Sequence, residues 1–149
     1  MTWQAPEGFE ERGRASFARQ RVMATIGARI VRVAPGEVDL ELPYREDLTQ
    51  QHGYIHAGIV STILDSACGY AAFTLMPPDA AILSIEFKVN LLAPAKGERL
   101  IVRARVKKAG RTITVCEADA FAVTGDEEKL VASMTGTMMC VLGRAGISG

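Results

Sequence analysis

The sequence predicts a two-layer α+β domain in which one long helix packs against a single antiparallel sheet. Two observations lead to this fold class. A largely apolar helical pattern covers residues 57–75, and six strand-like segments surround it, two before it and four after it. Short connections favour antiparallel neighbours, and a helix that is apolar on most sides has to be buried. A curved sheet of about six strands wrapped around the helix would cover both apolar surfaces.

The first elements in the chain are a helix and a hairpin. Small and apolar residues at helical spacing predict a helix over Glu10–Thr25, which Gly27 would end. Strict alternation over residues 37–43 and β-branched residues over 29–34 then predict two strands, with Pro35-Gly36 as the turn between them. We expect three parts along the chain: residues 1–26 as an N-terminal helical segment, 27–142 as the main domain and 143–149 as a flexible tail.

The long helix and the last four strands follow a polar loop over residues 45–55. Pro77-Pro78 would end the helix. In the first of the four strands we expect Ser84 to share a polar face with Glu86, Lys88 and Asn90, with the apolar residues from Leu83 to Val89 turned toward the helix. The four expected strands are Ala81–Leu91, Arg99–Lys107, Thr112–Val123 and Lys129–Leu142.

Composition excludes several classes of partner and site. The formal net charge is zero, from 17 basic and 17 acidic residues, so no global field attracts nucleic acid or an anionic membrane. Three cysteines and two histidines supply neither a disulfide framework nor a three-histidine zinc site. The longest apolar stretch is too polar to span a membrane, and the first fourteen residues lack a signal-peptide core. We therefore expect a cytoplasmic protein without metal or cofactor.

The residues that could carry chemistry lie around the start of the long helix. Small or short side chains form a stripe along it, and the carboxylate of Asp65 stands in that stripe, where a partly desolvated carboxylate could act as a general base or nucleophile. Backbone N–H groups near Ala57 and Gly58 could hold an oxyanion at the positive end of the helix dipole. Cys68 is better explained as a small buried residue, because neither histidine lies near it in sequence.

Within one chain, the N–H groups at the helix start and the carboxylate of Asp65 are too far apart to act on one carbonyl. His56 and Asp65 are nine positions apart, roughly 13 Å along a helix, whereas a carbonyl and its attacking water have to lie ~3 Å apart. Two copies of the helix, antiparallel across a two-fold axis, would bring the N-terminus of one copy to Asp65 of the other. We therefore expect a homodimer, or a dimer of dimers.

The sequence resembles a known enzyme family in several motifs. The run HGYIHAG over residues 52–58, followed by Asp65, is similar to the signature of phenylacetate-pathway (PaaI-like) hotdog-fold thioesterases, in the superfamily of the 4-hydroxybenzoyl-CoA thioesterases. The run SIEFKVNLLAPA over residues 84–95 and the turn at Gly110-Arg111 extend the likeness over nearly the whole domain. The resemblance implies a hotdog fold and an acyl-CoA thioesterase that needs no cofactor besides the coenzyme A of its substrate.

The resemblance also implies roles for individual residues. Asp65 would be the catalytic carboxylate and the Ala57 N–H would polarise the thioester carbonyl across the dimer interface, with His56 and Gln50 lining the same pocket. Ser84 would help to orient water, and Gly53 and Gly58 would lie against the substrate. Lys108 and Arg111 flank a turn, where they are either solvated or in contact with the phosphates of coenzyme A.

Two other functions remain open on the same fold. An enoyl-CoA hydratase or dehydratase would pair a catalytic histidine with a carboxylate, and His56 and Asp65 offer that pair. A non-catalytic acyl-CoA-binding protein would bind the ligand without turnover. Hydration without thioester cleavage, or binding without turnover, would separate these functions from hydrolysis.

Overall fold

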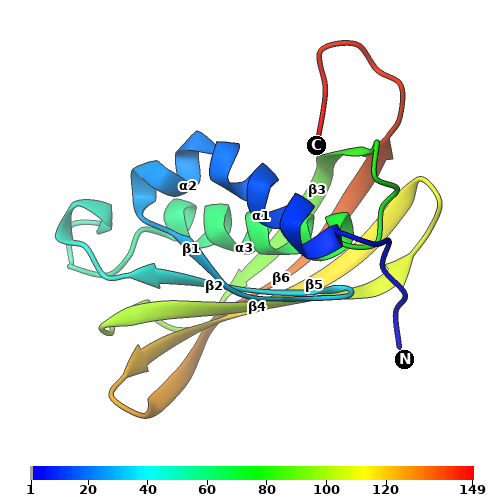
Figure 1. The fold of residues 1–149 in the computed structure, drawn as a ribbon. Coiled ribbons are helices and arrows are strands. Elements are labelled where there is room, and N and C mark those ends of the chain that lie inside the picture. Colours follow the sequence, from blue (N-terminus) through cyan, green and yellow to red (C-terminus); the bar gives the residue numbers. More distant parts are fainter. Residues whose placement is uncertain (1) are drawn as a thin grey trace.

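A computed structural model describes residues 2–149 and contains one six-stranded antiparallel sheet wrapped around a long helix (Figure 1). This is the expected hotdog arrangement, and the strand order is β1-β2-β4-β5-β6-β3. The helices are α1 (Phe9–Arg19), α2 (Arg21–Ile26) and α3 (Ala57–Phe73), with a short 3₁₀ turn η1 (Glu46–Leu48). The strands are β1 (Arg29–Ala34), β2 (Glu37–Pro43), β3 (Ala81–Leu91), β4 (Arg99–Ala109), β5 (Ile113–Thr124) and β6 (Glu127–Val141).

Helix α3 lies in the concave face of the sheet, and one side of it forms the centre of the core. Small residues on the sheet allow this close approach. A Cβ atom at Gly136 would lie 3.5 Å from the Cβ of Cys68 and 3.0 Å from the terminal methyl of Met138. The helix side facing the sheet is completely buried, because the sheet covers it from end to end; it includes Val60, Ile63, Leu64, Ala67 and Ala71.

The N-terminal helix is interrupted, so the prediction of one helix over 10–25 was wrong in this respect. Gln20 has an extended conformation, with φ −79° and ψ 94°, and separates α1 from α2. Its side-chain oxygen accepts a hydrogen bond from Ser66 on α3, 3.2 Å away. The break turns α2 so that Met23 and Ile26 enter the core, and Gly27, at φ 81°, ends α2 as expected.

A bulge in β3 overturns the expected faces of that strand. The pairing with β6 shifts between Ser84 and Glu86, which leaves Ile85 as the extra residue. Ser84 pairs with the buried Met138 and therefore faces α3, while Glu86 lies on the outer face. The prediction that Ser84 shares a face with Glu86, Lys88 and Asn90 was wrong, and Leu83 and Ile85 are exposed instead of turned toward the helix.

The end of the chain returns to the helical layer. The guanidinium of Arg19 on α1 donates a hydrogen bond to the carbonyl of Gly149. Gly149 also lies close to Phe73 and Ala80, so closely that a Cβ atom there would be 2.6 Å from the Phe73 ring. Within residues 2–149, no helix combines the length and apolarity that crossing a bilayer requires.

Candidate active site

The start of α3 presents one backbone donor that no residue between positions 2 and 149 satisfies. His56 is the N-cap residue, and its Nδ1 accepts a hydrogen bond from the Gly58 N–H at 2.8 Å. The N–H groups of Ile59 and Val60 donate to the carbonyl of His56. Among the described residues, the N–H of Ala57 has no acceptor. It therefore remains available at the positive end of the helix dipole.

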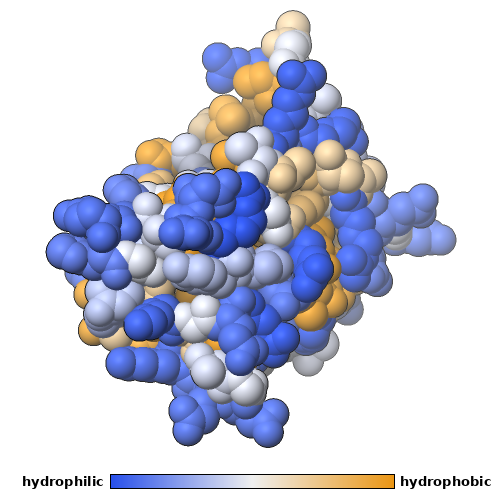
Figure 2. Space-filling view, turned by 90° about the vertical axis from the view of Figure 1, so that its left-hand side faces the viewer, coloured by the Kyte–Doolittle hydropathy of each residue, from blue (hydrophilic) through white to orange (hydrophobic). Residues whose placement is uncertain are grey.

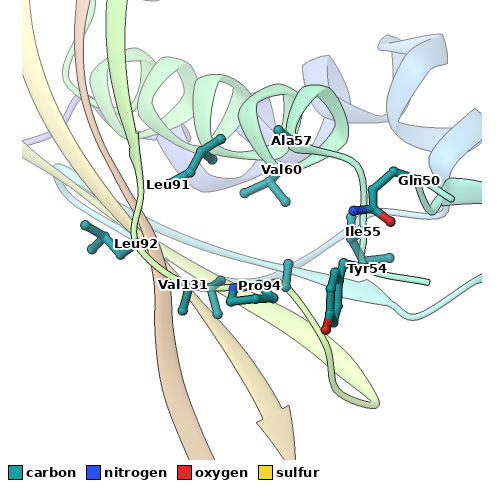
Figure 3. A pocket seen from close by; sticks show the side chains of 11 residues that line it. Gln50, Tyr54, Ile55, Ala57, Val60, Leu91, Leu92, Pro94 and Val131 are labelled. Atoms are coloured by element: carbon teal, nitrogen blue, oxygen red, sulfur yellow. The ribbon is translucent and has the colours of Figure 1, made fainter. Parts of the chain in front are cut away.

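A pocket of about 430 Å³ opens directly beside this donor. Figure 3 shows Ala57 and Val60 on α3 at one side of it, Leu91 and Leu92 at another, and Tyr54 and Pro94 at the side away from the helix. Most of the lining is apolar; it comprises Gln50, Tyr54, Ile55, Ala57, Val60, Leu91, Leu92, Ala93, Pro94, Ala95 and Val131.

Gln50 supplies an amide side chain to this pocket. Its side-chain oxygen accepts a hydrogen bond from the backbone N–H of His52, and its own backbone N–H donates to the carbonyl of Tyr54 at 2.9 Å. These two bonds fix the turn and the orientation of the amide. No acceptor in residues 2–149 takes the side-chain NH₂ of Gln50, so it forms a second free donor in the pocket that Ala57 lines.

The carboxylate of Asp65 lies on the open side of α3, held by a serine from the sheet. Ser84 Oγ donates to Asp65 Oδ1 at 2.7 Å, a contact that the bulge at Ile85 makes possible. The second carboxylate oxygen receives no hydrogen bond from the described residues. Asp65 is half-buried, so water reaches it. A half-buried carboxylate fixed on one oxygen and open on the other is suited to accept a proton.

The donor and the carboxylate are separated within the chain. Asp65 follows Ala57 by eight helical residues, roughly 12 Å at ~1.5 Å per residue. The pocket that contains Ala57 does not reach Asp65. The free donor and the carboxylate thus lie at different places on the same helix.

Comparison with known proteins places the chain in a family. Residues 52–129 match the family model described as the thioesterase superfamily. The chain belongs to this superfamily. It is a thioester hydrolase. A putative esterase of Halobacterium salinarum is 33% identical over 114 residues, which cover 72% of this chain and 75% of that protein.

Two further relatives agree with this assignment. Acyl-coenzyme A thioesterase 13 of Homo sapiens is 30% identical over 101 residues, covering 67% of this thioesterase and 70% of the human protein. The crystal structure of a thioesterase family protein from Silicibacter pomeroyi superposes with a TM-score of 0.90 at 59% identity, covering 91% of this chain and 100% of that one. The E. coli PaaI protein, at 17% identity and a TM-score of 0.81, shares the fold.

Not all of the other site residues expected from the sequence line the pocket of this thioesterase. His56 caps α3 and does not line the pocket. Its Nδ1 is occupied by the Gly58 N–H, so this nitrogen does not serve a histidine–carboxylate pair of the kind that a hydratase would need. Gly53 forms a turn at φ 82°, and its carbonyl accepts from the hydroxyl of Tyr44 at 3.2 Å. Gly58 lies on the exposed side of α3.

Lys108 and Arg111 lie at the far end of the sheet from the Ala57 pocket. Ile113, two residues after Arg111, pairs with Met139 on β6, whereas the pocket reaches Val131 on the same strand. Eight strand residues separate these positions, roughly 27 Å at ~3.4 Å per residue. Contact between these two cations and a thioester bound at Ala57 would therefore have to come from a second copy.

Several lining residues, chiefly Tyr54 and the segment 91–95, were not expected from the sequence. The chain holds this segment against the pocket by backbone contacts: the Ile55 N–H donates to the Ala95 carbonyl at 3.0 Å, and the Leu92 N–H donates to Val131 at 2.8 Å. The run LLAPA carried the signal, because an apolar run after a strand cannot continue an alternating pattern. Its partner residues on β6 are distant in sequence.

Metal and thiol chemistry receive no support from the side chains. No group of three or more His, Cys, Asp or Glu residues suited to hold a metal ion occurs in the described part of the chain. Cys68 and Cys116 are completely buried, and burial raises the pKa of the Cys68 thiol far above its ordinary value and that of Cys116 to about 12. Both stay protonated near neutral pH and are poor nucleophiles.

Proposed function

We propose that this thioesterase hydrolyses acyl-CoA thioesters at sites formed between two copies of the chain. Asp65 of one copy would act on a carbonyl polarised by the Ala57 N–H of the other. The observation that carries this proposal is the placement of a free helix-start donor and a serine-bound carboxylate roughly 12 Å apart on the same open side of one helix. The human relative named an acyl-coenzyme A thioesterase supports the substrate class.

A two-fold axis passing beside Ser61 would bring the half-sites together. Ser61 is the midpoint between Ala57 and Asp65, so antiparallel helices related by this axis would place each Ala57 beside the partner's carboxylate. The residues around the axis are small, and two hydroxyls among them are already satisfied within the helix: Ser61 donates to the Ala57 carbonyl and Thr62 to the Gly58 carbonyl, both at 2.8 Å. A second helix could therefore approach closely without leaving these two hydroxyls unsatisfied.

The edge of the sheet next to this helix face also favours self-association. Among the described strands β3 pairs only with β6, so its outer edge presents unpaired backbone groups that a second β3 could extend. Side chains at this edge are unusually apolar for an exposed strand and loop; they are Leu83, Ile85, Phe87, Leu91 and Leu92, each between 41% and 55% exposed. Pairing two β3 strands would bury them.

In the proposed reaction, Asp65 accepts a proton from water as the water oxygen attacks the thioester carbon. The developing oxyanion lies at the N–H of Ala57, with the Gln50 amide as a second donor. When the tetrahedral intermediate collapses, the carbon–sulfur bond breaks and the thiolate takes the proton from Asp65, which leaves a free acid and a thiol. Ser84 holds the carboxylate in position throughout. Direct attack by Asp65, through an anhydride that water then cleaves, is the alternative use of the same geometry.

Replacing Asp65 by Asn tests the carboxylate. D65N keeps the shape and the contact with Ser84 but removes the proton acceptor, and we expect kcat for acyl-CoA hydrolysis to fall roughly 10²–10⁴-fold with unchanged circular dichroism. Thiol release from a panel of aryl and alkyl acyl-CoAs measures it. Turnover near that of the unmodified protein would exclude Asp65 from the chemistry.

Mixing two inactive variants tests the shared site. A57P removes the N–H donor, and D65N removes the carboxylate. A heterodimer of the two contains one site with both groups intact and one with neither. Equal amounts, unfolded and refolded together, should regain about a quarter of the unmodified activity if subunits pair at random. The two variants refolded separately and then assayed together without exchange are the control. No recovery in exchanged mixtures that contain heterodimers would refute the shared site.

A further inference from the structure

The serine that holds Asp65 has a second acceptor on its other side. Ser84 Oγ lies 2.7 Å from Asp65 Oδ1 and 3.3 Å from the sulfur of Met138. A hydroxyl carries one proton, so Ser84 can donate fully to only one of these two acceptors at a time. The direction of the hydroxyl, and with it the support of the carboxylate, therefore depends on what lies at Met138.

Met138 occupies the core side of Ser84. The two residues pair across β3 and β6, so their side chains share the face that α3 covers, and Met138 is completely buried. The absence of a side chain at Gly136 gives room to the Met138 methyl, because a Cβ atom there would lie 3.0 Å from that methyl and 3.5 Å from the Cβ of Cys68. Met138 thus fills the space between Ser84 and the helical turn that follows Asp65.

A thioether suits this place because it fills the space without taking the proton. Thioether sulfur is a weak acceptor, whereas a hydrogen bond to a carboxylate is charge-assisted and roughly twice as strong as a neutral one. The Ser84 proton therefore goes to Asp65. At the surface, water would compete for it: Figure 2 shows a face of the protein on which hydrophilic residues surround smaller hydrophobic areas. Behind Ser84, the buried side chain of Met138 keeps water away.

We propose that Met138 is a positioning residue for hydrolysis, which directs the Ser84 hydroxyl to Asp65 by closing off every strong alternative acceptor. The inference rests on the proposed role of Asp65 as the proton acceptor and adds a residue that touches neither the substrate nor the reacting atoms. Met138 acts only through Ser84. Its contribution to turnover therefore has to vanish when the serine hydroxyl is absent.

Truncation of Met138 tests this assignment. M138A opens the space beside Ser84, so the hydroxyl can adopt other rotamers and bind water that enters. We expect kcat for a coenzyme A ester to fall about tenfold with an unchanged KM, because the charge-assisted bond that supports Asp65 is weakened. M138L refills the space with a side chain of similar volume and no acceptor, and its kcat should stay within about threefold of the unmodified value. Thiol release measures both variants.

Two controls separate positioning from a general loss of packing. Met134 lies on the same strand and the same face, is also buried, and pairs with Val89 and Ala118, so M134A should destabilise the fold without changing kcat per folded molecule. In the S84A background, M138A should cause no further loss of kcat. An unchanged kcat in folded M138A would overturn the assignment. So would an equal loss in M134A, or an undiminished loss in the S84A background.

Methyl resonances of isotope-labelled methionine test the contact without any change at Met138. M138L identifies the Met138 resonance by its absence. In D65A the hydroxyl of Ser84 loses its strong acceptor and turns to the sulfur, so we expect the Met138 methyl resonance to shift relative to the unmodified protein. The same resonance should shift much less between S84A and D65A/S84A. Equal shifts in both pairs, or no shift in either, would exclude the contact.

The failure of this inference and that of the proposed function give different results. If D65N hydrolyses coenzyme A esters as fast as the unmodified protein, the proposed role of Asp65 fails, and the methyl resonances alone decide whether Met138 shares the Ser84 proton. If D65N is inactive while folded M138A turns over at the unmodified rate, positioning by Met138 fails alone.

Discussion

The terminal backbone groups of α3 are hydrogen-bonded at its C-terminal end but not fully at its N-terminal end. At the C-terminal end, the guanidinium of Arg12 donates to the carbonyls of Phe73 at 2.7 Å and Met76 at 2.9 Å, and it lies 4.5 Å from the centroid of the Phe73 ring. At the N-terminal end, His56 satisfies Gly58 but leaves the Ala57 N–H exposed to a pocket. The protein satisfies the carbonyls at one end, the closed end, whereas the other, open end keeps a backbone donor free.

The difference between the two ends has a physical reason. Unsatisfied carbonyls at a helix end cost stability when no water reaches them, so α1 covers that end with an arginine. A free N–H beside solvent costs little, because water can satisfy it until a substrate replaces the water. The distinction between the ends can be tested by changing one end at a time.

The largest effect is expected at the open end. A57P deletes the N–H, while proline suits the first position of a helix, and His56 before it already has φ −57° and ψ 137°, which proline tolerates. We expect kcat to fall roughly 10²–10³-fold with little change in stability. A57G, which keeps the donor, should stay within a few-fold of the unmodified rate. Equal losses in both variants would mean that the methyl group, not the N–H, matters.

At the closed end, the expected effect is on stability. Arg12→Met removes two hydrogen bonds to the end of α3 and should lower the free energy of unfolding by about 2–3 kcal/mol in urea denaturation. Activity per folded molecule should remain unchanged, because Arg12 is remote from Ala57. A rate loss at conditions where the variant is fully folded would contradict the separation of the two ends.

Because the thiol of Cys116 is buried near the closed end of α3, we expect the stability of the protein to fall at alkaline pH. Burial raises the pKa of Cys116, which lies near Ala72, from 9.0 to about 12. A raised pKa in the folded state stabilises the protein fully below pH 9 and progressively less as the pH rises toward 12. Between pH 8 and pH 10, ionisation in the unfolded state should therefore lower the stability by roughly 1 kcal/mol on account of this thiol. C116A should reduce this pH dependence. If the free energy of unfolding changes with pH as steeply as before, the Cys116 thiol is not shielded from water.

The smallest effect is expected at the cap of the open end. His56→Ala should cost about 1 kcal/mol of stability, because the Gly58 N–H loses its acceptor, and His56→Asn should restore most of it. Turnover of folded protein should change only a few-fold in both. A loss of more than a hundredfold in the Asn variant would instead give His56 the catalytic role that the sequence first suggested.

Local patterns were sufficient for most of the fold. Alternation predicted β2, and helical spacing with Pro77-Pro78 after it predicted α3, because each signal lies within the element itself. The bulge at Ile85 had no such signal. It depends on how β3 pairs with β6, fifty residues away, and it turns Ser84 to the opposite face. The break at Gln20 likewise follows from tertiary contacts, which place Met23 and Ile26 in the core.

The residues of the candidate site likewise divide into those that local sequence signals predict and those whose position depends on tertiary structure. Ala57, Asp65 and Gln50 are recognisable from the loop and helix that contain them. The separation of the Lys108–Arg111 turn from the pocket is a property of the sheet pairing, and the lining of one pocket by both Lys96 and Lys129 depends on the close approach of Gly97 to β5. Neither follows from spacing along the chain.

The edge of the sheet opposite β3 is poorly suited to pair with a further strand, which limits how far the sheet can be extended. β1 has six residues, against eleven in β3, and its pairing with β2 is interrupted between Ile30 and Arg32. Arg29 and Arg32 on it are held in ion pairs with Glu41 and Glu37. A short, interrupted and charged rim is a poor template for another strand. If two chains join through β3, the joined sheet ends in two such rims, and fibre-like extension stops at the pair.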